Sequence, residues 1–169
     1  MQNWKEYGDS QYCCTTSQDL NDAQQVCDIL KIKLHIADFS SEYWTKIFQH
    51  FLNEYAAYRT PNPDVLCNKE IKFNVFLDHA KSLGANYIAT GNYAKHITIK
   101  NKEHLLKGDD TTKDQSYFLH LLNQKQLASS LFPLGKLTKQ TVRKIAKEYN
   151  LPNHSKKDKI GRASCRERV

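Results

Sequence analysis

Apolar residues recur at helical spacing between residues 43 and 55, and this stripe constrains the fold more than any other feature of the sequence. Its members are Tyr43, Trp44, Ile47, Phe48, Phe51, Leu52 and Tyr55. A face this broad and this aromatic predicts an amphipathic helix that packs against a core. Ser40 and Ser41 stand where such a helix would be capped. We therefore expect the stripe to be core and not a cofactor-binding surface.

The rest of the chain alternates between helical and extended patterns. Helical spacing predicts further helices over 19–31 with Asp19 as N-cap, about 68–83 with Gly84 as the stop, and near 115–122, 124–131 and 138–150. Short apolar runs predict strands over 33–39 and 86–91, and alternation around Lys100-Asn101 predicts a β-hairpin over 93–107. Helices and short strands joined by short connections are typical of a parallel sheet flanked by helices. The sequence therefore predicts an α/β fold.

Composition fits a globular domain and argues against a membrane protein. The chain has 169 residues, 40% of them hydrophobic and 25% charged. No apolar run approaches the roughly 20 residues that cross a bilayer, and the N-terminus lacks an apolar signal stretch. We expect a cytoplasmic monomer with no membrane partner.

Charge, cysteines and histidines narrow the function further. The net charge of +7 favours an anionic partner, with nucleic acid more natural than a membrane. The five cysteines are irregularly spaced, which indicates thiols more than structural disulfides. The histidines are scattered, and adjacent Cys13 and Cys14 lack the spacing of zinc ligands, so no structural metal is expected.

The last residues of the sequence look foreign to the rest. Ile160–Val169 follows no helical or strand period and resembles one reading frame of a common sequencing adapter. The alternative is an Arg-rich tail that touches phosphate. We expect one domain over 1–158 and a non-native tail over 159–169, which removes Cys165 from the chemistry.

The stretch from Thr60 to Phe73 is the most informative for function. Its prolines stiffen a loop that delivers Asp64 and Cys67 to the start of a helix, where the helix dipole favours a thiolate. A cysteine of lowered pKa beside a carboxylate is typical of a sulfur nucleophile with a proton handler. The spacing alone favours another interpretation, in which Asp64 only caps the helix and Cys67 is a small buried residue.

This stretch is similar to the signature of the tRNA-specific 2-thiouridylases, and other segments agree with that family in the same order. They are Met1-Gln-Asn-Trp-Lys-Glu6, Tyr87–Tyr93, Lys113-Asp-Gln-Ser-Tyr-Phe-Leu119, Phe132-Pro-Leu-Gly135 and Val142-Arg-Lys-Ile-Ala146. Ordered matches over residues 1 to about 158 are much more specific than any one of them. The resemblance implies a Rossmann-like fold of the PP-loop ATP pyrophosphatase type, and it favours the nucleophile over the buried filler.

The resemblance implies an ATP-dependent enzyme that replaces the C2 oxygen of the wobble uridine in tRNA with sulfur. ATP, arriving with Mg²⁺, adenylates that oxygen, and a persulfide on a cysteine supplies the sulfur while AMP leaves. A separate relay protein would donate the persulfide sulfur. By resemblance, Cys67 is the nucleophile that attacks the persulfide or closes a disulfide with a second cysteine, and Asp64 is the general acid/base.

The resemblance also implies which residues bind. The target base would be lined by Asn62, Pro63 and Asp64, the adenine nucleotide would contact Met1 and Gly91, and tRNA would contact Asn92, Lys113, Asp114 and Gln115. Asn92 stands where the family usually has His. From the residues alone, 113–115 fits equally a solvated helix start capped by Asp114, and Gly91 fits a strand-end turn.

The sequence departs from the family pattern near both ends. The Ser-Gly-Gly-x-Asp-Ser string that grips pyrophosphate is absent, and the stretch after Asp158 lacks the persulfide-bearing cysteine. A glycine-rich loop is what holds the phosphates of ATP. We therefore expect an N-terminally truncated domain that is inactive as this chain alone. Two alternatives are a non-catalytic basic RNA-binding module and another ATP pyrophosphatase with a different substrate.

Overall fold

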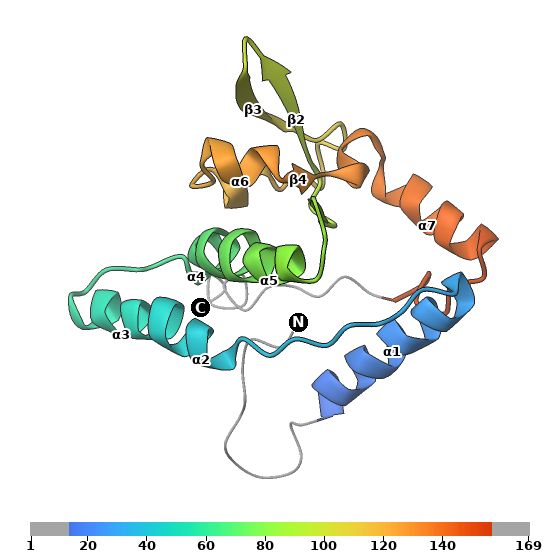
Figure 1. Cartoon of the computed structure of the whole chain (residues 1–169), viewed down its shortest axis with the longest axis horizontal. Coiled ribbons are helices and arrows are strands. Elements are labelled where there is room, and N and C mark those ends of the chain that lie inside the picture. The colour runs from blue at the N-terminus through green and yellow to red at the C-terminus, as the bar shows by residue number, and fades with distance from the viewer. Residues whose placement is uncertain (1–13, 157–169) are drawn as a thin grey trace.

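The computed structural model describes residues 14–156, and the side chains among them from residue 17 onward. Helix α1 (Cys14–Leu30) leads through an extended segment into the helices of the left half of Figure 1. The prediction of Asp19 as an N-cap is wrong, because the helix already includes Cys14 and the Asp19 carboxylate instead accepts a hydrogen bond from Lys156 Nζ at 3.0 Å.

The strand predicted over 33–39 is also wrong. Residues 32–37 have no regular structure, and Asp38 forms a single bridge. A strand depends on continuous pairing with a neighbouring backbone, and within the described part of the chain this segment has only the bridge at Asp38. Ile32 and Ile36 are consequently 57% and 65% exposed.

The aromatic helix spans residues 40–56, as its periodicity predicts. It consists of α2 (Ser40–Tyr43), the π-helical turn η1 (Trp44–Phe48) and α3 (Gln49–Ala56). Ser40 and Ser41 do not cap it. The carboxylate of Asp38 instead accepts hydrogen bonds from Ser40 N and Oγ at 3.0 and 2.6 Å. Beyond the other end, Arg59 donates to both carboxylate oxygens of Glu54 at 2.6 and 2.7 Å.

The expectation that the whole stripe is core is wrong. Ile47 is 1% exposed, whereas Trp44, Leu52 and Tyr55 stay about half exposed. The rings stack along the helix, with 4.7 Å between the centroids of Trp44 and Phe48. Periodicity indicates which face is apolar, but burial depends on what packs against that face.

The next helix is continuous over residues 63–82. It is built from α4 (Pro63–Leu66), the π-helical stretch η2 (Cys67–Val75) and α5 (Phe76–Ser82). The predicted start near residue 68 is wrong, because Pro63 suits the first helical position, where an N–H is not needed. The predicted stop is confirmed: Gly84 has φ +91°, and Ala85 N donates to Ala80 O at 3.0 Å.

Two small sheets follow. Strand β1 (Ile88–Ala89) pairs in parallel with β4 (Ser130–Leu131), and β2 (Ala94–Ile99) pairs antiparallel with β3 (Lys102–Lys107). Lys100 and Asn101 both have positive φ, 49° and 59°, as a two-residue type I′ hairpin turn requires. The predicted hairpin is confirmed, and Figure 1 shows it projecting at the top of the molecule. Parallel pairing with flanking helices confirms the α/β class.

Shorter elements complete the described chain. They are the 3₁₀ turns η3 (Ser116–Leu119) and η4 (Pro133–Lys136), and the helices α6 (Gln124–Ala128) and α7 (Lys139–Glu148). The helix predicted over 124–131 ends early because Ser130–Leu131 pairs with β1. Thr138 caps α7, with Oγ1 accepting from Thr141 N at 3.2 Å. None of the helices within residues 14–156 is both long and apolar enough to span a membrane.

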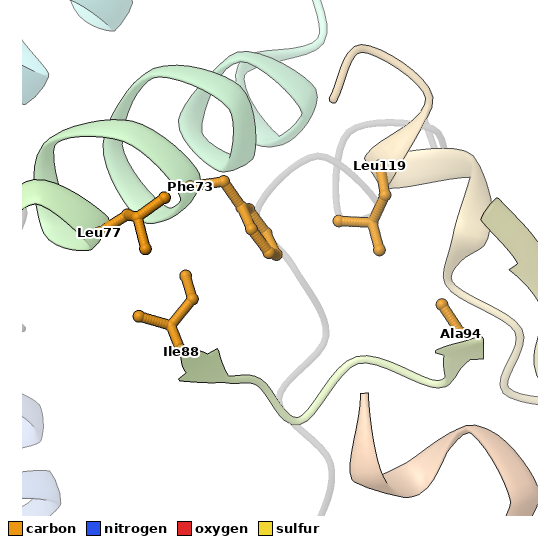
Figure 2. Close-up of a cluster of buried hydrophobic side chains, with 5 residues drawn as sticks. All are labelled: Phe73, Leu77, Ile88, Ala94 and Leu119. Atoms are coloured by element: carbon orange, nitrogen blue, oxygen red, sulfur yellow. The ribbon is translucent and has the colours of Figure 1, made fainter. Parts of the chain in front are cut away.

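One hydrophobic cluster joins helix 63–82 to both sheets. Phe73 and Leu77 from the helix point toward Ile88 of β1, with Ala94 of β2 and Leu119 of η3 completing the group (Figure 2). All five side chains are nearly or fully buried. This cluster fixes the end of β1 and the 113–119 segment relative to the helix that carries Cys67.

Candidate active site

The predicted target-base residues occupy the first turn of helix 63–82. Asn62 is the N-cap, and its Oδ1 accepts hydrogen bonds from the N–H groups of Asp64 and Val65 at 3.1 and 3.3 Å. Asp64 follows in that turn, half-buried. The structure therefore assigns the cap to Asn62, and the suggestion that Asp64 only caps the helix is not needed.

Cys67 lies one turn inside this helix and is only 9% exposed. It packs in a second hydrophobic cluster with Phe39, Ile47 and Ile71. Burial raises the pKa of the Cys67 thiol, because the thiolate would lose its hydration in this apolar setting. The prediction of a lowered pKa is wrong. It assumed a helix that starts near residue 68, directly after Cys67, whereas the helix starts at Pro63.

Two charges act on Cys67 in opposite directions. Asp64, three residues earlier and so on the same helical face, adds to the rise of the Cys67 pKa, and Lys72 opposes it. Lys72 was not among the predicted site residues. Its signal was a cation five residues after the cysteine in the same helical segment. Burial and Asp64 thus favour the protonated thiol by raising its pKa, whereas Lys72 favours the thiolate.

These shifts predict the reactivity of Cys67. Because the folded pKa is raised, the rate of alkylation of Cys67 by iodoacetamide should rise with a midpoint above the ordinary thiol value of about 8.5. Lys72→Gln should move that midpoint up and Asp64→Asn should move it down. The measurement is peptide-resolved mass spectrometry over pH 6–11, with the chain unfolded in guanidinium as control. A folded midpoint below the unfolded one would contradict the account.

The same shift has a consequence for stability. A thiol whose folded pKa is raised stabilises the fold fully below the unfolded pKa, and this contribution is lost as pH rises through the folded pKa.

Cys67 and Cys27 are both reduced, with no disulfide at either.

Residues 113–118 tie the predicted site segments together. Asn68, next to Cys67, donates from Nδ2 to Phe118 O at 3.1 Å. Gln115 makes two bonds to Tyr93: its Oε1 accepts from Tyr93 N at 3.1 Å, and its N–H donates to Tyr93 O at 3.0 Å. Tyr93 directly follows Asn92. One short segment is therefore bonded on one side to the helix of Cys67 and on the other to the strand end at Asn92.

Asn68 was not among the predicted site residues. It is 4% exposed, and its Oδ1 has no hydrogen-bond partner among the described residues. The only sequence signal for it was its place directly after Cys67. Its bond to Phe118 O makes it a positioning residue for the start of η2.

Asp114 and Gln115 are used within the protein. Asp114 accepts from Gly108 N at 3.1 Å and from Ser116 N and Oγ at 3.3 and 2.9 Å. Burial alone would raise the pKa of Asp114, but these hydrogen bonds outweigh it and the pKa is lowered. The interpretation of Asp114 as the cap of a solvated helix start is wrong, because Gln115 holds the N-cap position of η3, which has no side-chain cap bond, and Asp114 is half-buried. Lys113 borders a surface cleft.

Gly91 lies just past β1 and is exposed. A Cβ there would meet nothing nearer than Leu134 Cδ1 at 4.0 Å, so its backbone borders open space at the carboxyl end of a parallel strand. This is the edge of the sheet at which α/β folds bind ligands. The described residues offer no glycine-rich loop for the phosphates. No group of three metal-ligating side chains occurs in this part of the chain either.

Some predicted features lie outside the described residues. They are Met1, Cys13, Cys165 and the tail over 159–169. The roles of these positions stay predictions, and so does the domain boundary at 158.

Comparison with known proteins gives a consistent set of relatives. A family model described as "tRNA methyl transferase HUP domain" matches residues 1–162. The chain is 55% identical, over 161 residues, to the tRNA-specific 2-thiouridylase MnmA of Hahella chejuensis (strain KCTC 2396). The aligned region covers 95% of this chain and 44% of that relative. The proteins of the same name from Proteus mirabilis (strain HI4320) and Pseudomonas fluorescens (strain SBW25) are also 55% identical, covering 95% of this chain and 44% and 43% of those relatives. The chain thus spans less than half the length of these curated relatives.

Proposed function

Because the chain belongs to the tRNA methyl transferase HUP domain family, we propose that it forms the catalytic part of a tRNA 2-thiouridylase. The relatives that carry this name match nearly the whole chain. In this role the chain takes part in replacing the C2 oxygen of the wobble uridine of tRNA with sulfur. ATP is the co-substrate, and it would activate the C2 oxygen by adenylating it.

The observation that carries the proposal is the linkage of three segments through residues 113–118. The Asn68–Phe118 bond holds this segment to the Cys67 helix, and the two Gln115–Tyr93 bonds hold it to the strand end. A base placed against Asn62, Pro63 and Asp64 would lie one helical turn from Cys67. A tRNA that contacts Lys113 would then have its target base delivered to a fixed place relative to the thiol.

The raised pKa of Cys67 gives Asp64 a definite task. Near neutral pH the buried thiol is protonated, so a nucleophilic role requires that its proton be removed as it reacts. Asp64, one turn earlier, is the carboxylate that would accept this proton. Lys72 would favour the thiolate once it forms. The Cys67 thiolate would then attack the inner sulfur of a persulfide on a second cysteine, forming a disulfide with that cysteine and expelling hydrosulfide, which would displace AMP from the adenylated C2 position.

The remaining partners are part of the same proposal. Gly91 and Met1 would contact the adenine nucleotide, which arrives with Mg²⁺, and Asn92, Lys113, Asp114 and Gln115 would contact tRNA. A persulfide relay protein would supply sulfur, and the enzyme would act as a cytoplasmic monomer. The net charge of +7 supports an anionic macromolecular partner.

The test is a chimera. Residues 14–156 replace the aligned segment of the Hahella chejuensis relative, and the chimera is expressed in a bacterial strain that lacks its own 2-thiouridylase. We expect 2-thiouridine to return to the tRNA of that strain, measured by nucleoside chromatography and mass spectrometry. A folded chimera that leaves the uridine unmodified would contradict the proposal and favour a non-catalytic RNA-binding role.

A further inference from the structure

A cationic cleft lies between the segment that follows β3 and the start of α7. It has a volume of about 470 Å³ and is lined by Asp110, Thr112, Lys113, Thr138, Lys139, Gln140 and Arg143. Three of these seven side chains are cations, and they come from two segments far apart in the sequence. We name this surface the α7 cleft.

The single carboxylate in the α7 cleft is already occupied by internal donors. Asp110 is 9% exposed. Its Oδ1 accepts from Thr112 N and Oγ1 at 3.0 and 2.6 Å, and its Oδ2 accepts from Lys139 N at 2.8 Å. These bonds, led by the Thr112 hydroxyl, lower the pKa of Asp110. The carboxylate therefore fixes the turn to the helix, and Lys113 also acts on it electrostatically. The cleft lining carries three cations and this one carboxylate, so its net charge is positive.

Two of the first N–H groups of α7 are used within the protein, because Lys139 N donates to Asp110 and Thr141 N donates to Thr138 Oγ1. A ligand in the cleft would therefore meet mainly the side chains that line it. Lys139 and Arg143 are four residues apart and share one face of α7, with Gln140 beside them. Arg143 also donates to Lys156 O at 3.3 Å, which orients its guanidinium.

We propose that the α7 cleft binds the phosphate backbone of tRNA, with Lys139 and Arg143 as contacts beyond the predicted Lys113. Cations from two segments that flank one cleft suit successive phosphates of a nucleic acid strand. Lys113 belongs to the segment that is bonded to both the Cys67 helix and the strand end, so RNA held here would extend from the active site along α7. The inference rests on the proposed function, because it takes tRNA as the anionic partner.

The test measures the affinity of the full chain for an unmodified tRNA transcript by fluorescence anisotropy over a salt series. The variant is Lys139→Gln/Arg143→Gln, and the matched control is Lys102→Gln/Lys144→Gln. The control removes the same charge from the hairpin and from α7 but spares the cleft lining. We expect the cleft variant to bind about tenfold or more weakly near 0.1 M salt, and its slope of log K against log salt to shrink by about 2. The control should change both quantities much less.

Equal losses for the two double variants would overturn the inference, since they would show only a general charge effect. The inference would also be overturned if inorganic phosphate displaced tRNA from the chain and the cleft bound tRNA no more tightly than free phosphate. The same substitutions in the chimera provide an independent readout: the cleft variant should raise KM for tRNA and leave kcat unchanged. An unchanged KM in a chimera that makes 2-thiouridine would reject the cleft while leaving the proposed function intact.

Discussion

Replacing Cys67 by Ser in the chimera should lower the rate of 2-thiouridine formation by about a thousandfold or more, with tRNA affinity nearly unchanged. A serine hydroxyl fits the same buried space but cannot exchange sulfur or form a disulfide. The side chain packs among Phe39, Ile47 and Ile71 and is 9% exposed, so its loss should not disturb an RNA surface. Single-turnover formation of 2-thiouridine and a tRNA binding curve measure the two quantities.

Cys27→Ser is the matched control for this prediction. Cys27 is also buried and reduced, but it belongs to α1 and has no part in the proposed chemistry. We expect the control to keep nearly full activity. A Cys67→Ser chimera as active as the Cys27→Ser chimera would remove the nucleophile from the proposal. An RNA-binding module without catalysis predicts that neither substitution matters.

Gly135→Ala should destabilise the fold by about 3 kcal/mol, the largest effect on stability that we expect from a single added methyl group. A Cβ at Gly135 would lie 2.1 Å from Ala94 O and 2.5 Å from Lys95 Cγ. The loop cannot easily retreat from β2, because Gly135 O accepts a hydrogen bond from Asp109 N at 2.9 Å. Urea unfolding of the full chain followed by circular dichroism gives the change in the free energy of unfolding.

Gly91→Ala is the stability control for Gly135→Ala. At Gly91 a Cβ would come no closer than 4.0 Å to Leu134 Cδ1, so the added methyl group meets no clash. We expect its free energy of unfolding to stay within about 0.5 kcal/mol of the parent chain. If the two variants had the same stability, the close contact between η4 and β2 would be refuted.

Local chemistry explains the parts of the fold that the sequence predicts well. The hairpin follows from alternation around a turn at Lys100 and Asn101, and the helix stop follows from Gly84, which has a φ of +91°. The helix predicted over 138–150 is also found, as α7 over Lys139–Glu148. Each of these features depends on a few neighbouring residues, so no knowledge of the tertiary structure is needed.

The errors share a different cause. The segment over 33–39 has a strand pattern, but a strand also needs a partner that the pattern does not show. The pKa of Cys67 is raised, whereas the sequence predicts a lowered one, because Phe39 and Ile47, distant in sequence, bury the thiol. The bonds of Asn68 and Gln115 to residues far along the chain are equally tertiary. Motif similarity predicts which segments form the site, but the direction of the Cys67 pKa shift depends on how the chain packs.

If this chain supplies the catalytic segments of a tRNA 2-thiouridylase, AMP and 2-thiouridine should form in equal amounts. The purified chimera is incubated with ATP, a persulfide donor and unmodified tRNA, and AMP and 2-thiouridine are measured together. The account predicts one AMP released for each wobble uridine converted, with conversion abolished by Cys67→Ser. Release of AMP or binding of tRNA with no 2-thiouridine, by a chimera with native-like unfolding, would contradict it.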